Sequence, residues 1–469
     1  MEKLKVGATI KLAKGLSELD YKKLPPEVIT KAKQLLLDYI GYTIFAYKEE
    51  QAAEIIISTI KELEGKPEST VLGYGFKTSC MLSAFANGAM GHMTELDDTH
   101  PGTGSHPGDS VIASALALGE REGISGKELL LAIIAGYETV LRIGESVMPT
   151  HYWRGFHPSA TVNTFGAAVA GGKILKFNPE QMAGALGLAG LQASGYFYFV
   201  PEGIRMPKDF NTGRAALSGV LAALLVKNGF QGGKTVLESD KGFCKLFSDP
   251  FSIRYERISD RIGQLFKIIE VAHKPYAGGR YIHPAIDATL NILEKNSINP
   301  DEVEEVNARI FETGAIFVDV PEPWLPKWAG YGTRFSTQFN LAVALLEGKK
   351  GIQGLLNHDN VREKINDPTV REFMKKIKVI PDADLDKGYP KAYPVIVEIK
   401  TKKNIYLERV DIPKGEPENP ITQKELEEKF ITLAGNALKR QDVEKVLHMV
   451  NTIEELKDIR NLLKLFTNK

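Results

Sequence analysis

The sequence has little cysteine, no net charge and no long apolar run, and each shortage excludes a class of protein. Only Cys80 and Cys244 occur in 469 residues, too few for a disulfide framework or a cysteine-rich zinc site, which favours a reducing, cytoplasmic setting. The 59 basic residues balance the 59 acidic ones, whereas a protein that binds nucleic acid normally has a basic excess. We therefore expect no nucleic-acid partner.

The longest apolar stretches are also interrupted. Residues 129–147 contain Gly, Tyr, Glu and Arg, so they fall short of the roughly 20 apolar residues that a membrane span needs. The first residues, MEKLKVGATIKLAKGL, lack the apolar core and cleavage site of a secretory signal. We expect neither a membrane span nor a secreted protein.

Helical periodicity dominates the first half of the chain. Apolar residues recur every three to four positions in segments that open with Ser, Asn-Pro or Pro-Pro and often close with Gly, as capped helices do. These segments are 24–45, 52–65, 125–144, 159–176, 178–195 and 213–230. Because the last four are rich in Gly and Ala, the axes of their helices can approach closely. They predict a tightly packed helical bundle.

The pattern changes near Phe266. Alternating, β-branched segments occur at 267–279, 304–314, 373–383 and 392–415, and helices are expected near 283–296 and 334–348. The chain should therefore be mainly α. We expect a large all-helical domain at 1–265, a smaller α+β domain at 266–410, and C-terminal helices at 411–469 that pack on the large domain. Residues 415–420, GEPENP, would be the linker.

One polar segment interrupts the helical half. Residues 91–108, GHMTELDDTHPGTGSHPG, concentrate three histidines, three carboxylates and two prolines in eighteen residues. The titratable residues are His92, Glu95, Asp97, Asp98, His100 and His106. Such groups are costly to bury without partners, and loops between rigid helices often carry catalytic groups. This segment is the candidate active site.

Four further polar segments occur at 152–158, 203–210, 272–283 and 330–335. They supply Arg205, Lys208, Lys274, Arg280 and Arg334, together with His157, Tyr276 and His283. Cations in Gly- and Pro-shaped loops suit a substrate with several carboxylates. His157 precedes a predicted helix, whose positive end favours a neutral imidazole.

Each pattern has a plainer interpretation. Asp97, Asp98 and Thr99 could cap a helix or form a turn, and Lys274 and Arg280 alone could be surface charges. His92, His100, His106 and the aspartates could form a zinc site, but no H-E-x-x-H motif or cysteine pair fixes a ligand geometry. We expect no metal. The co-occurrence of five such segments favours an active site.

Taken together, the motifs resemble the MmgE/PrpD family. They are H-x-x-E-L-D-D-T-H followed by G-S-H-P-G, G-F-H-P-S-A-T-V-N-T-F-G-A-A, K-D-F-N-T-G-R-A-A-L-S-G, H-K-P-Y-A-G-G-R-Y-I-H-P-A-I-D and G-E-P-E-N-P. The resemblance covers nearly the whole chain. It implies a helical domain with a smaller α+β lid, a homodimer, no metal or other cofactor, and an active site in the cleft between the domains.

Carried over by motif, the resemblance points to Glu95, Thr99, His106, His157, Lys208 and Lys274 as the catalytic and substrate-binding set. To these we add Asp98, which could orient His106, and the substrate-binding candidates Arg205, Tyr276, Arg280, His283 and Arg334. The sequence departs from the family at Glu95, where Asp is usual, and at Phe339, where the decarboxylases have Tyr. Residues 211–215 are closer to the decarboxylase and epimerase branches than to the dehydratases.

The expected chemistry is cofactor-independent proton transfer at a carbon next to a carboxylate of a di- or tricarboxylate. His157 would act as acid or base at that carbon, while His106, oriented by Glu95 or Asp98, would deliver a proton. Lys208, Lys274 and Arg280 would stabilise the enolate-like charge. A hydro-lyase like 2-methylcitrate dehydratase is the first expectation. The alternatives are a lyase like cis-aconitate decarboxylase, an epimerase of an imino- or amino-dicarboxylate, and a non-catalytic carboxylate-binding protein.

Overall fold

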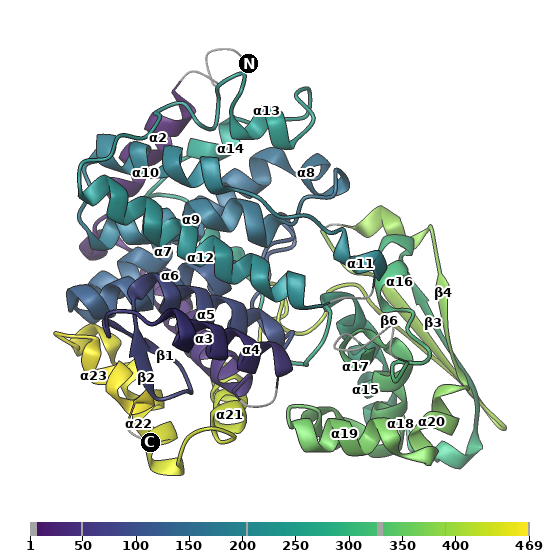
Figure 1. The fold of residues 1–469 in the computed structure, drawn as a ribbon. Coiled ribbons are helices and arrows are strands. Elements are labelled where there is room, and N and C mark those ends of the chain that lie inside the picture. The colour runs from purple at the N-terminus through teal and green to yellow at the C-terminus, as the bar shows by residue number, and fades with distance from the viewer. Residues whose placement is uncertain (1–6, 48–49, 203–204, 326–331, 390, 468–469) are drawn as a thin grey trace. The chain divides into compact units, whose positions relative to one another are not determined.

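The computed structural model describes residues 7–47, 50–202, 205–325, 332–389 and 391–467. The chain divides into two compact units (Figure 1). Unit 1 comprises Met1–Tyr198, Met206–Val271 and Gln423–Lys469, and unit 2 comprises Phe199–Arg205 and Ala272–Thr422. Parts of two predicted polar segments, residues 203–204 and 330–331, lie outside the described residues.

Unit 1 is a helical bundle. Its longer helices are α3 (Pro26–Phe45), α5 (Cys80–Met93), α6 (Pro107–Glu122), α7 (Gly126–Val147), α9 (Pro158–Ile174), α10 (Pro179–Gln192) and α12 (Met206–Lys227). The shorter ones are α2 (Ala8–Ser17), α4 (Gln51–Leu63), α8 (Thr150–Trp153), α13 (Phe243–Phe247), α14 (Glu256–Ser259), α21 (Gln423–Ala434), α22 (Arg440–Asn451) and α23 (Arg460–Leu463). A small antiparallel pair, β1 (Ser69–Val71) and β2 (Phe76–Thr78), lies beside them.

Several helices begin close to the predicted residue, but α12 begins at Met206 instead of 213, so Lys208 and Asn211 lie on the helix and not before it. Ser125 caps α7 and Asn178 caps α10, each in a reciprocal capping box, an arrangement in which the cap contributes about 1 kcal/mol. In the centre of the bundle α12 packs on α5 and α9, and α6 packs on both as well (Figure 1). Buried Gly and Ala on these helices allow this close packing. The elements that carry the polar segment therefore form the middle of the core.

Unit 2 is an α+β unit. Its sheet has the order β4-β3-β5-β6, in which β3 pairs with β4 in parallel and the other neighbours are antiparallel. The strands are β3 (Val303–Ile310), β4 (Ile377–Pro381), β5 (Val395–Thr401) and β6 (Ile405–Val410). The helices are α11 (Phe199–Glu202), α15 (His283–Lys295), α16 (Glu312–Val318), α17 (Gly332–Phe335), α18 (Thr337–Gly354), α19 (His358–Asn366) and α20 (Pro368–Met374). Apolar residues of β3, β5, α15 and α18 form its core.

The mainly α fold with a smaller α+β part is confirmed, but one local prediction is wrong. Residues 267–279 form no strand: Lys267–Glu270 is a 3-10 helix and a loop follows it. Alternation in β-branched residues did not distinguish a strand from this loop. Residues 415–420 form a hydrogen-bonded turn, in which the backbone N–H of Gly415 donates to Asn419 O and that of His273 donates to Gly415 O.

Among the described helices, none combines the length and the apolar character that crossing a membrane requires.

Candidate active site

The polar segment forms a buried loop between two helices of unit 1. α5 ends just after His92, and α6 begins just after His106, its N-cap residue. Pro107 fits the first turn of α6 because an N–H at that position has no partner within the helix. The side chains of the loop that are at most 5% exposed include Glu95, Asp97, Asp98, Thr99 and His100. Buried carboxylates and imidazoles need partners, and the loop supplies them.

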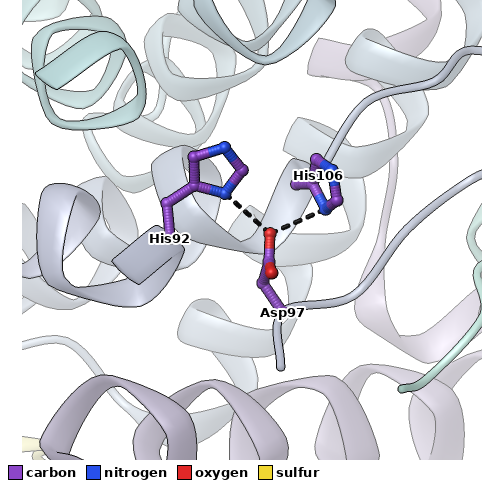
Figure 2. A group of neighbouring side chains, drawn as sticks. All are labelled: His92, Asp97 and His106. Atoms are coloured by element: carbon purple, nitrogen blue, oxygen red, sulfur yellow. Dashed lines mark hydrogen bonds and ion pairs between the residues drawn. The ribbon is translucent and has the colours of Figure 1, made fainter. Parts of the chain in front are cut away.

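Asp97 lies at the centre of these groups. Its Oδ2 atom is 2.8 Å from Nδ1 of His92 and 2.6 Å from Nδ1 of His106. Figure 2 shows both rings directed at this single oxygen, one from α5 and the other from the start of α6. An ionised carboxylate only accepts hydrogen bonds, so both nitrogens act as donors. Asp97 therefore fixes the orientation of two imidazoles at once.

The contacts of His106 determine which of its nitrogens holds the proton. Nδ1 lies 2.8 Å from the backbone oxygen of Asp98 as well as 2.6 Å from the Asp97 carboxylate. Both partners accept, so Nδ1 carries the hydrogen and Nε2 is the atom that exchanges a proton. The charge of Asp97 stabilises the imidazolium that forms when Nε2 takes one up.

His157 has the opposite arrangement. It is the N-cap residue of α9, and the Nδ2 amide of Asn211 donates to its Nδ1 over 3.1 Å. The neutral ring therefore carries its hydrogen on Nε2. Burial, together with the nearby His92 and Lys208, holds the pKa of His157 well below its usual range, so the ring is a neutral hydrogen-bond donor at pH 7.

The three imidazoles form one cluster. The ring of His92 lies 4.8 Å from that of His106 and is stacked 5.7 Å from that of His157. Burial and the charge of Lys208 lower the pKa of His92 to about 3, against the opposing effect of Asp97. His92 is therefore neutral, and it connects the two candidate proton-transfer residues.

Lys208 and Glu95 form a buried ion pair. Lys208 and Asn211 lie three residues apart on α12, so one helix face reaches both Glu95 and His157. Glu95 has a φ of 54°, a left-handed conformation that costs a residue with a Cβ about 1–2 kcal/mol. The ion pair helps to hold the residue in this conformation.

The Asp98 carboxylate points away from His106. It accepts from Gly108 N at 3.0 Å and from the Tyr137 hydroxyl at 2.7 Å. A Cβ on Gly108 would lie 2.8 Å from Asp98 Oδ1 and from Tyr137 Oη, so only glycine permits this approach. Burial raises the pKa of Asp98 to about 7, and burial with the neighbouring Asp97 and Asp98 raises that of Asp109 well above its usual range.

Two groups in unit 1 have the residue types of a metal site, His92–Asp97–His106 and His100–Glu145–Glu270. In the first, tetrahedral ligands at metal–ligand distances of about 2.0–2.1 Å would lie roughly 3.3 Å apart, but the Nδ1 atoms approach Asp97 to 2.6 and 2.8 Å. In the second, Lys267 Nζ lies 3.0 Å from both glutamates and supplies the positive charge. Both arrangements fit hydrogen bonds and ion pairs better than a metal.

Unit 2 contains a second polar cluster. Arg280 donates from Nε to Glu416 at 2.7 Å, and its Nη1 lies 3.2 Å from Nδ1 of His283. The Tyr276 hydroxyl donates to Asp287 at 2.6 Å, and Lys274 is almost fully buried. Arg280, His283 and Tyr276 thus hold the loop 272–283 and the turn 415–420 together, and their binding of substrate stays a prediction.

The remaining candidates also belong to unit 2. Arg205 ends the segment Phe199–Arg205, and Arg334 lies in α17, where its backbone oxygen accepts from Gly279 N at 2.9 Å. Phe339, which is part of α18, is 1% exposed and belongs to the hydrophobic core of unit 2. Its ring is a packing element.

The structure thus brings Glu95, His106, His157 and Lys208 into one cluster of unit 1, with Thr99 buried in the same loop. One expectation is corrected: neither the Glu95 nor the Asp98 carboxylate orients His106, because Asp97 and the Asp98 backbone oxygen do so. The catalytic set expected from the sequence lacks His92, Asp97, Asp109 and Asn211, although all four lie within or next to the motifs quoted above. Asp97 and Asp98 are adjacent residues of one type, and only the backbone of the loop decides which carboxylate faces the histidines.

Comparison with known proteins finds one family along most of the chain. Residues 10–256 match the MmgE/PrpD N-terminal domain, and residues 276–455 match the MmgE/PrpD C-terminal domain. A cis-aconitate decarboxylase of Aspergillus terreus is 27% identical over 98% of this chain and 96% of its own length. The cis-aconitate decarboxylases of Mus musculus and Homo sapiens are 26% and 27% identical, over 93% and 96% of this chain and 89% and 92% of theirs.

The geometry predicts that the cluster folds without a metal. After dialysis against a chelator, the purified protein should hold only substoichiometric zinc, iron and manganese by elemental analysis, and its melting temperature should be unchanged. Loss of a stoichiometric metal with a lowered melting temperature would show that the His92–Asp97–His106 group is a metal site.

Asp98 should make stability depend on pH. The pKa of Asp98 is about 7 in the folded state, above the usual value of about 3.9 that applies to the unfolded chain. Between these two values the folded state holds a proton that the unfolded state has lost. Protonation of Asp98 therefore contributes to the free energy of unfolding at low pH, and this contribution is lost as pH rises from about 4 to 7. His92 changes the free energy of unfolding in the opposite direction below about pH 6.5, so the effect of Asp98 has to be read from the difference between a variant and the wild type. Asp98→Asn cannot lose this proton. The free energy of unfolding of the variant, measured in urea, should therefore increase relative to that of the wild type as pH rises from about 4 to 7. A constant difference would show that Asp98 is already ionised.

Proposed function

The chain belongs to the MmgE/PrpD family of enzymes, and we propose that it is a cofactor-independent lyase that decarboxylates cis-aconitate or a closely related unsaturated tricarboxylate. The relatives named cis-aconitate decarboxylase match it over nearly its whole length. The observation that carries the proposal is a pair of imidazoles with opposite proton placement, the half-buried His106 and the buried His157. Such a pair can deliver a proton and hold a developing negative charge.

The proposed reaction needs one proton and no cofactor. In cis-aconitate the bond between the CH2 carbon and its carboxylate breaks and CO2 leaves. The released electron pair forms a double bond to the central carbon, and the former double-bond pair moves to the CH carbon, where the adjacent carboxylate delocalises it. Protonation of that carbon gives a methylene-substituted dicarboxylate. One proton is consumed for each CO2 released.

The residues divide this work. His106, as imidazolium stabilised by Asp97, delivers the proton from Nε2 to the CH carbon. His157 stays neutral and donates its Nε2–H to the carboxylate on which charge develops, since a neutral imidazole is a hydrogen-bond donor that needs no proton exchange. Within unit 1, Lys208 holds a carboxylate of the substrate as a point charge.

Dehydration of 2-methylcitrate, the first expectation, is the second candidate. It uses the same enolate-like charge, with His106 protonating a leaving hydroxyl instead of a carbon. Phe339 favours keeping this candidate, because it lacks the hydroxyl of the tyrosine that the decarboxylases carry there. The similarity of the whole chain to decarboxylases favours the first proposal.

A substrate panel separates the possibilities. Purified protein without added metal should release CO2 from cis-aconitate and form a five-carbon dicarboxylate. In deuterated solvent, NMR should show one deuterium on the former CH carbon, now a saturated CH2 next to a carboxylate, and none on the double-bonded methylene carbon. Formation of an unsaturated acid from 2-methylcitrate would establish the dehydratase. Solvent exchange at a carbon of an amino- or imino-dicarboxylate, with no CO2 released, would establish an epimerase.

His106→Gln should lower kcat by about a hundredfold or more, the usual scale for removing a proton-transfer group. His157→Gln should lower it by about a hundredfold as well, the scale for removing a donor that stabilises developing negative charge. Both should keep the circular dichroism spectrum and melting behaviour of the wild type. His448→Gln, an exposed position on α22, is the matched control and should keep full activity. Near-normal turnover in either active-site variant would contradict its role.

A further inference from the structure

We propose that Lys429, on the C-terminal helix α21, is a positioning residue for the loop that carries Glu95 and Asp97. Its Nζ donates to the backbone oxygen of Leu96 over 3.1 Å and lies 2.6 Å from Oδ1 of Asp38 on α3. Leu96 lies between Glu95, which pairs with Lys208, and Asp97, which accepts hydrogen bonds from His92 and His106. The role in turnover rests on the proposed function, whereas the tether itself does not.

The side chain of Lys429 is held in place on several sides. It is 6% exposed, α21 packs directly on α3, and Nζ lies 5.9 Å from the ring centroid of Tyr42. A Cβ on Gly41 would come within 3.2 Å of the Phe430 ring, so glycine there allows α21 to approach α3. Besides Leu96 of the loop, the ammonium group contacts Asp38 and Tyr42, which both lie on α3. Lys429 therefore connects the loop to the helix pair α3–α21.

The Leu96 carbonyl is an effective point at which to hold this loop. Glu95 has a left-handed backbone, and the following peptide must be turned so that the Asp97 side chain faces His92 and His106. A hydrogen bond from an ammonium group is roughly twice as strong as one between neutral groups. Without it, we expect the 96–97 peptide to relax and the Asp97 carboxylate to leave the position between the two rings.

A general contribution of the Lys429–Asp38 pair to stability is the competing explanation. Removing Lys429 alone would leave Asp38 buried without its ion-pair partner, which destabilises the fold whatever the loop does. The informative variant is therefore the neutral double substitution Asp38→Asn with Lys429→Met. Asp38→Asn alone keeps the ammonium group and its bond to Leu96. Lys33→Met is the matched control, because Lys33 also ties α3 to the C-terminal segment, through Glu454 at 2.9 Å, but is bonded to a group outside the loop.

Hydrogen–deuterium exchange measured by mass spectrometry tests the tether without any substrate. In the double variant the peptide that covers residues 94–106 should exchange about tenfold faster or more, the change that a loss of 1.4 kcal/mol of local stability gives. Peptides from α7 should exchange as in the wild type. Lys33→Met should leave the 94–106 peptide unchanged. Asp38→Asn leaves the ammonium group buried without its carboxylate partner but keeps its bond to Leu96, so it should raise exchange of the 94–106 peptide less than the double variant does. Unchanged exchange in the double variant, or an equal increase throughout unit 1, would overturn the proposal.

Kinetics then tests the positioning role. With the substrate found in the panel, the double variant should lose about tenfold or more in kcat with a smaller change in KM, because a misplaced proton donor affects the chemical step more than binding. An unchanged kcat with a loosened loop would overturn the role in turnover. If no substrate reacts with the wild type, the proposed function fails while the exchange result still decides the tether. If the double variant does not fold, Asp38→Asn with Lys429→Gln, whose arm is shorter, replaces it with the same expectations.

Discussion

Oδ2 of Asp97 accepts hydrogen bonds from His92 and His106 at a place where none of the three groups is well exposed, and this shared acceptor constrains the rest of unit 1. A buried carboxylate is tolerated when donors surround it, and removing one partner of a buried charged pair typically lowers the free energy of unfolding by about 3–5 kcal/mol. The end of α5 and the start of α6 must therefore meet within hydrogen-bond distance of one oxygen. Close packing through small residues on these helices makes that meeting possible.

The loop between the two helices is held in a conformation that it would not adopt alone. The left-handed backbone of Glu95 costs about 1–2 kcal/mol, whereas a hydrogen bond to a charged group contributes about 1.5–3 kcal/mol. Two such contacts flank the strained position, from Lys208 to Glu95 and from Lys429 to Leu96. Together they exceed the strain, and they come from helices far apart in the sequence. The C-terminal helix thus contributes to the position of groups near residue 95.

Much of the fold and of this cluster could be predicted from the sequence. Helical period, caps and Gly stops located the main helices, and His157 was placed correctly at the start of a helix. The sequence could not choose Asp97 over Asp98 as the partner of His106, because adjacent residues of one type differ only in the direction that the backbone gives them. Nor could it find Lys429, which lies on a charged helix and is selected only by the close approach of α21 to α3. The 267–279 segment was mistaken for a strand because alternation over a few residues also arises in loops tied by hydrogen bonds.

The charges of the cluster explain why it suits a reaction that consumes a proton. Three aspartates lie together, and burial and their mutual repulsion favour the neutral acid at Asp98 and Asp109. Asp97, which receives two N–H groups, is the place where a negative charge is best stabilised. Lys208 pairs with Glu95, so Asp97 is left with the N–H groups of His92 and His106 as its donors. The proposed decarboxylation would consume one proton at each turnover, delivered from Nε2 of His106 beside Asp97. An epimerase would return its proton to the substrate and would have less need of such a buried, singly charged acceptor.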